Sequence, residues 1–188
     1  MNCISSFLEN MEHEFPNHTQ LNVNRNGYKV DGEGIKKKCR LDALKSVDYY
    51  EIHEKYGFLY VEFSDLLKQE IQIQERVERV NLSDLSKRDK RDFLKRFFNE
   101  INRELVAKFK DSFIIRRMMP DNITNIPDEF DSQGTFVIVI APLAPQLKKE
   151  ELIEITKFLD TLKDKVIHSI PRDMFTKVKV TTLDKFCT

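Results

Sequence analysis

Asp42 and Glu62 are the two residues whose type and surroundings best suit metal-dependent chemistry in this chain. Asp42 lies in the apolar run 40–44, and Glu62 lies twenty residues later, near the end of a second apolar run, 58–63. Two carboxylates on adjacent strands can share a divalent cation, because Mg²⁺ takes oxygen ligands and usually only one or two protein carboxylates. An ion held there could activate water for phosphodiester cleavage.

The segment between these acids predicts paired strands. Residues 49–53 and 58–63 are short runs rich in aromatic and β-branched residues, and the turn between them contains Gly57. Such runs around a Gly-containing turn are typical of a β-hairpin. Because side chains alternate along a strand, we expect Tyr60, Glu62 and Ser64 to share one face.

This pattern resembles the PD-(D/E)xK nuclease superfamily, in which one strand carries an acid and the next carries an acid-x-Lys tripeptide. The resemblance covers about residues 36–70 and implies that Asp42 and Glu62 are catalytic metal ligands, with Mg²⁺ as the cofactor. Ser64 stands where the family has its catalytic lysine, and a serine cannot supply positive charge. Lys68 would then be the substitute, since the lysine has migrated in some members of the family.

Three interpretations of this segment stay open. We prefer a non-catalytic or degenerate nuclease-like subunit of a larger nucleic-acid-processing or antiviral-defence assembly, with one or more protein partners. Three observations favour this interpretation: Ser64 in the lysine position, the zero net charge and the 14 phenylalanines, which suit an apolar interface. The alternative is an active Mg²⁺-dependent endonuclease. The third interpretation is a solvent-facing hairpin whose acids are ordinary surface charges.

Composition limits the classes of protein that fit. The 188 residues suit one domain, and the 31 basic residues balance the 31 acidic ones. A dedicated nucleic-acid binder would usually be basic, so only local contact with DNA or RNA is expected. The candidate contacts are Lys36, Lys38, Arg88, Arg91 and Lys95.

Cysteine usage and hydropathy predict a cytoplasmic protein. The three cysteines are scattered and form no CxxC or Cys/His cluster, so a zinc site is not expected. The first residues have no basic region followed by an apolar signal core. No apolar run approaches the roughly 18–20 residues that a membrane span needs, so no membrane partner is expected.

The element pattern predicts a single-domain α/β/α sandwich with a mixed central sheet, which also agrees with the order of elements in the nuclease superfamily. We divide residues 1–188 into an N-terminal helix and polar loop (1–34), a strand hairpin with the candidate site (35–70), and a helix-strand-helix-strand unit (86–188). Within these parts we expect helices at 4–15, 65–78, 86–111 and 147–170, and strands at 28–30, 36–44, 113–119, 135–141 and 175–183.

Two of these elements carry most of the expected core. Residues 135–141 are almost wholly apolar, so this strand should be buried on both faces at the middle of the sheet. The 86–111 helix has apolar residues at spacings of three and four, which predicts one face packed on that sheet. Its apolar stripe consists of Phe93, Leu94, Phe97, Phe98, Ile101, Leu105, Val106 and Phe109.

Overall fold

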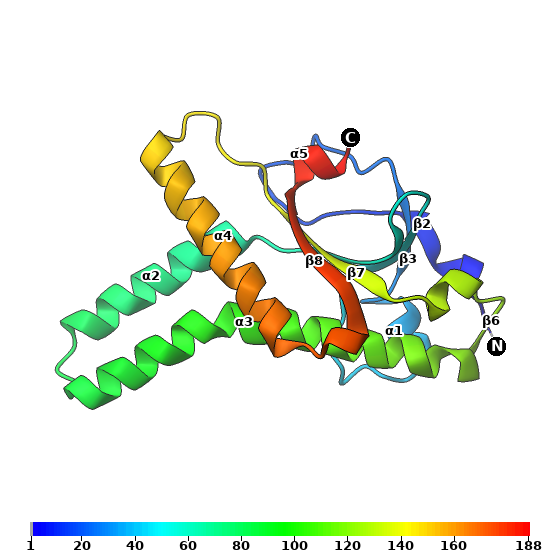
Figure 1. The fold of residues 1–188 in the computed structure, drawn as a ribbon, viewed down its shortest axis with the longest axis horizontal. Helices are drawn as coiled ribbons and strands as arrows, with labels where there is room; N and C mark the ends of the chain where they lie inside the picture. Colours follow the sequence, from blue (N-terminus) through cyan, green and yellow to red (C-terminus); the bar gives the residue numbers. More distant parts are fainter. Residues whose placement is uncertain (1) are drawn as a thin grey trace.

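A six-stranded mixed sheet forms the centre of the computed structural model, in the strand order β2-β3-β4-β5-β7-β8 (Figure 1). Neighbouring strands from β2 to β5 are antiparallel, whereas β5, β7 and β8 are parallel. The strands are β2 (Leu8–Asn10), β3 (Asn26–Lys29), β4 (Tyr49–His53), β5 (Gly57–Phe63), β7 (Gly134–Ile140) and β8 (Phe175–Thr182). A separate parallel pair joins β1 (Asn2–Cys3) to β6 (Ile123–Thr124). The α/β class with a mixed sheet is therefore confirmed.

The structure describes residues 2–188, apart from the side chains of Leu94, Phe97 and Phe98. These three side chains belong to the stripe expected on the 86–111 helix, so that part of the prediction lies outside the described residues. The α-helices are α1 (Ile35–Lys38), α2 (Leu66–Leu82), α3 (Lys87–Met118), α4 (Lys149–Ser169) and α5 (Leu183–Phe186). Short 3₁₀ turns are η1 (Ile4–Phe7), η2 (Met119–Asp121), η3 (Asp128–Asp131) and η4 (Arg172–Met174).

The predicted hairpin and the predicted central strand are both present. In β4 and β5, Tyr49 pairs with Val61 and His53 with Gly57. Gly57 closes this hairpin with a φ of 69°, a left-handed backbone conformation that glycine adopts without steric cost. Strand β7 lies between β5 and β8, and all seven of its residues are buried. An apolar run without alternation therefore did indicate a strand covered on both faces.

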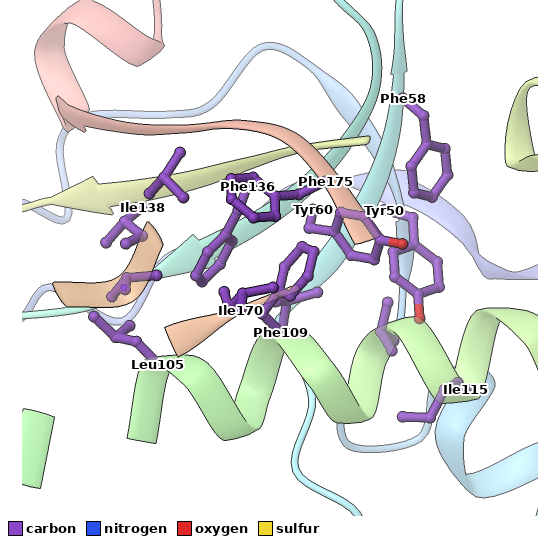
Figure 2. Close-up of a cluster of buried hydrophobic side chains, with 14 of the residues drawn as sticks. Tyr50, Phe58, Tyr60, Leu105, Phe109, Ile115, Phe136, Ile138, Ile170 and Phe175 are labelled. Carbon is purple, nitrogen blue, oxygen red and sulfur yellow. The ribbon is translucent and has the colours of Figure 1, made fainter. Parts of the chain in front are cut away.

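The two faces of the sheet are covered differently. Long helices cover one face, where Leu105 and Phe109 of α3 pack under Tyr60 and Phe136 (Figure 2). On the other face, the irregular segment 11–25 and α5 supply the apolar cover, including Phe15 and Phe186. The molecule thus has three layers, but only one outer layer is built from long helices.

Helices α2 and α3 form an antiparallel arm that extends beyond the sheet (Figure 1). Side-chain caps begin both helices, because Asp65 accepts a hydrogen bond from the backbone of Lys68 and Ser86 accepts one from the backbone of Asp89. Leu82, close to the tip, is 87% exposed. The half of α3 nearer its C-terminus is the part that packs under the sheet.

Three predicted elements are wrong. The expected 4–15 helix is instead η1 followed by strand β2, and the expected 113–119 strand is the last part of α3. Residues 36–44 are not a strand, because α1 ends at Lys38 and a turn follows. Arg40 in that turn has a φ of 58°, which is incompatible with an extended run. In each case the local sequence pattern was compatible both with the predicted element and with the observed one, and tertiary packing decided between them.

Candidate functional site

Asp42 and Glu62 do not lie on neighbouring strands. Asp42 is exposed in the turn after α1, whereas Glu62 is in β5 and is only 1% exposed. The expected pairing of these two acids is therefore wrong, and its cause is the turn that replaces the 36–44 strand. Lys68 is exposed on the first turn of α2, and no side-chain bond links it to Glu62.

Glu62 has a different cationic partner, Lys108 of α3. The Nζ atom of Lys108 donates a hydrogen bond of 2.6 Å to Oε1 of Glu62. The second carboxylate oxygen, Oε2, is buried and has no partner among the described residues. Burial, together with the nearby Asp48 carboxylate, raises the pKa of Glu62 well above its usual value, and the Lys108 charge opposes that rise.

Asp48 is the second acid of the site. It directly precedes β4, and extending the Tyr49–Val61 register by one residue sets Asp48 across from Glu62. Its Oδ2 atom accepts a 2.7 Å hydrogen bond from the backbone N–H of Phe63. Burial raises the pKa of Asp48 to about 6, although the Phe63 bond and the Lys108 charge oppose the rise.

Lys108 remains the positive charge of this group. Burial alone would lower its pKa, but the carboxylates of Glu62 and Asp48 outweigh that effect and raise it. The side chain keeps 23% of its surface exposed. Two carboxyl groups with raised pKa values therefore share one ammonium group. With both carboxylates ionised, the group has a net charge of −1 and would favour a proton or a further cation.

The turn of α3 that carries Lys108 is attached to the segment before β4. The backbone N–H of Val47 donates to the hydroxyl of Ser112 at 2.8 Å, and the Tyr50 hydroxyl donates to the Ser112 carbonyl at 2.6 Å. One residue earlier on α3, Asp111 accepts from the backbone N–H of Lys45 at 2.9 Å. These bonds fix the position of Lys108 relative to Asp48.

A pocket of about 270 Å³ opens onto Asp48. Its wall includes the acids Glu12, Glu14 and Asp31 and one basic residue, Lys29. His13 also lines it, but both of its ring nitrogens are engaged: Nδ1 accepts from the Phe15 N–H, so Nε2 donates to the Leu21 carbonyl. This histidine is therefore not a free general base.

Two carboxylate oxygens of this group remain as candidate ligands for a divalent cation. Among the described residues, Oε2 of Glu62 has no hydrogen-bond partner and Oδ1 of Asp48 accepts no hydrogen bond. Across these residues no group of three or more His, Cys, Asp or Glu side chains is arranged to hold a metal ion. Two carboxylates are nevertheless a usual protein contribution to a Mg²⁺ site.

The predicted nucleic-acid contacts lie on two helices. Lys36 lies on α1, where its Nζ is paired with the Asp31 carboxylate, and Lys38 is exposed at the end of the same helix. Arg88, Arg91 and Lys95 are exposed on the part of α3 that belongs to the arm. None of these five residues lines the pocket beside Asp48.

The sequence did contain a signal for Asp48. Pairing across a hairpin follows from its turn, and His53 opposite Gly57 leads back, residue by residue, to Asp48 opposite Glu62. The role of Lys108 had no such local signal, because it depends on how α3 crosses the sheet. Beyond this geometry, no protein-family model, curated protein or solved structure matches the chain.

Proposed function

We propose that this chain cleaves phosphodiester bonds of nucleic acids, with Asp48 and Glu62 as ligands of a divalent cation and Lys108 as the cation that contacts the reacting phosphate. The observation that supports this most is the 2.6 Å contact between Lys108 and Glu62 beside Asp48. An acid on β5, an acid directly before the neighbouring β4 and one lysine provide the groups that a PD-(D/E)xK-like site needs. Asp48 takes the place that we assigned to Asp42, and Lys108 the place that we assigned to Lys68.

Each residue has a separate task in this proposal. Asp48 and Glu62 present the unpartnered oxygens that would hold Mg²⁺, which when bound supplies a Lewis acid and a more acidic water. Lys108 stays protonated and compensates negative charge that develops on a phosphate. Asp48 lines the pocket, whereas Glu62 and Lys108 do not, so we assign Asp48 as the ligand nearest to solvent. Cation binding requires ionised carboxyls, and the pKa values of Asp48, about 6, and of Glu62 are both raised, so activity should increase as the pH rises above about 6.

The second candidate is the non-catalytic nuclease-like subunit, and the burial of Glu62 favours it. A carboxylate that is 1% exposed and bonded to Lys108 is also what remains when a catalytic site has become a structural ion pair. Ser64, in the position of the family's lysine, is buried and cannot replace the charge. In this case the partners would be proteins of a nucleic-acid-processing assembly.

A cleavage assay separates the two proposals. Supercoiled plasmid, single-stranded DNA and single-stranded RNA are incubated with the protein and Mg²⁺ or Mn²⁺, at pH 6 to 9. We expect cleavage that EDTA abolishes, that Asp48→Asn loses and that Asp42→Asn retains. The two variants make the same chemical change at a pocket residue and at an exposed turn, so Asp42→Asn is the matched control.

Two results would contradict the enzyme proposal. One is no cleavage of any substrate with either ion, which would leave the non-catalytic subunit. The other is equal cleavage by Asp48→Asn and the unmodified protein, which would mean a contaminant or another site. Calorimetric titration with Mn²⁺ gives a readout independent of activity, and Asp48→Asn should weaken that binding. Circular dichroism of each variant excludes unfolding as the cause.

A further inference from the structure

Strand β8 leaves one side of its backbone without a strand partner among the described residues. It is the last strand of the sheet, and it pairs only with β7. It runs for eight residues, and α5 follows its C-terminal end (Figure 1). The outer N–H and C=O groups of an edge strand can pair with another extended chain.

A groove of about 400 Å³ accompanies this edge, between β8 and α4. Its apolar lining comes from Val178 and Val180 of β8, Leu159 of α4 and Ile140 of β7. This volume lies within the range of pockets that hold ligands. An added strand would point alternate side chains into the groove, because strand side chains alternate between faces.

Four lysines surround the same groove. Lys177 and Lys179 alternate with the valines of β8, Lys163 comes from α4 and Lys185 from α5. Among the described residues none of the four forms an ion pair, and the groove has one acid, Asp160. Lys177 and Lys179 lie over the ring of Tyr56, with Nζ 5.7 and 5.3 Å from its centroid, so their positive charge flanks the groove on the face of β8 opposite Val178 and Val180.

We propose that this groove binds an extended, acidic segment of a partner protein, which adds a strand to β8. Acidic residues of that segment would face Lys177 and Lys179, and the apolar residues between them would enter the groove beside Val178 and Val180. The expected sequence is thus an alternation of Asp or Glu with Val, Ile or Leu. This proposal does not depend on nuclease activity.

Charge and hydrogen bonding select this occupant over two others. A second copy of β8 would place lysines of two strands against one another, and like charges that face each other across a strand pair are destabilising. Phosphate oxygens of a nucleic acid accept hydrogen bonds but do not donate them, so the outer C=O groups of β8 would stay unpaired. A peptide backbone supplies both donors and acceptors.

Binding of a designed peptide tests the proposal. The probe is a fluorescein-labelled peptide of eight residues that alternates Glu and Val, which matches the length of β8. We expect saturable binding by anisotropy and slower hydrogen exchange of the backbone amides in residues 175–182. The variant Lys177→Glu/Lys179→Glu should bind the peptide about tenfold more weakly or worse. A tenfold loss corresponds to the loss of at least one favourable charge pair. The control Arg79→Glu/Lys87→Glu makes the same charge change at two exposed positions of the arm and should bind normally.

Three outcomes would overturn the proposal. Equal affinity for a peptide methylated at alternate backbone nitrogens would mean charge attraction without strand pairing. Binding of an eight-nucleotide single-stranded DNA that depends on Lys177 and Lys179, with no binding of the peptide, would identify a nucleic-acid site. Slower exchange in residues 175–182 that depends on protein concentration would identify a second copy. Lys177→Gln/Lys179→Gln, a milder change, replaces the double charge reversal if that variant fails to fold.

Discussion

Glu62 of β5 and Lys108 of α3 are 46 residues apart in the chain, yet Oε1 of one lies 2.6 Å from Nζ of the other. The pair joins the central sheet to the long helix. The two side chains are buried to different extents: that of Glu62 is 1% exposed and that of Lys108 is 23% exposed. Removal of the lysine would therefore leave the more deeply buried charge without compensation.

We predict that Lys108→Met destabilises the fold at pH 7. Removing one partner of a buried pair costs about 3–5 kcal/mol when the remaining charge persists, and less here where Glu62 can take up a proton. Urea denaturation measures the loss. The double variant Glu62→Gln/Lys108→Met should lose less than the sum of its single variants, because the single variants share the penalty of an unpaired group. Additive losses would contradict an energetic link between the residues.

The control for this prediction is Lys37→Met. Lys37 also pairs with a glutamate, Glu33, but that pair lies four residues apart on the surface. Exposed ion pairs contribute little to stability because water screens them. The midpoint of urea denaturation should therefore stay unchanged in Lys37→Met.

The Asp48 carboxyl predicts a pH dependence of stability. Its pKa in the folded state, about 6, is above the ordinary value of 3.8, so the folded protein binds more protons between these two values. The contribution of Asp48 to the free energy of unfolding should then fall by roughly 2–3 kcal/mol as pH rises from about 4 to 6, and stay level above that. Asp48→Asn removes this titration, so the fall should be smaller in that variant. Urea denaturation at pH 4.5, 5.5 and 7.5 measures both slopes, and equal slopes would contradict the prediction.

The sequence was sufficient for elements with a strong and unambiguous period. The hairpin around Gly57, the buried strand 135–141 and the edge strand near the C-terminus follow from alternation or from its absence. The helices expected at 65–78 and 86–111 are present as α2 and α3, and the apolar spacing of the second is a local signal. These are local signals, and no distant contact is needed to interpret them.

The candidate site required information that is not local. The sequence of residues 36–44 is compatible with an extended strand. In the structure, Ile35 is buried in the main core as the first residue of α1, and the chain turns after this helix. Asp42 therefore points into solvent while Asp48, six residues later, borders the pocket. Which lysine lies beside Glu62 depends on the position of α3, and the hydrogen bonds that Val47 and Tyr50 donate to Ser112 fix that position.

We predict that Lys108, and not Lys68, contributes to cleavage if the nuclease proposal holds. Loss of a group that stabilises transition-state charge typically lowers kcat by about 10²–10³-fold, so Lys108→Gln should show a loss of that order. Lys108→Arg should recover part of the rate because it restores the charge. Lys68 is exposed on α2, so Lys68→Gln should retain the full rate. A larger loss in Lys68→Gln than in Lys108→Gln, measured in single-turnover assays, would reverse the assignment.

The last prediction concerns the two ends of the helical arm. Leu105 of α3 is 2% exposed and packs in the main core, whereas Leu82 at the end of α2 is 87% exposed. Leu105→Ala should destabilise the protein by about 2–5 kcal/mol, because it removes buried methyl groups and leaves a cavity. Leu82→Ala makes the same chemical change on the surface and should shift the free energy of unfolding by less than about 0.5 kcal/mol. Urea denaturation compares them directly. A loss of several kcal/mol in Leu82→Ala would mean that another chain or another copy covers the tip of the arm in solution, and protein concentration should then alter that loss.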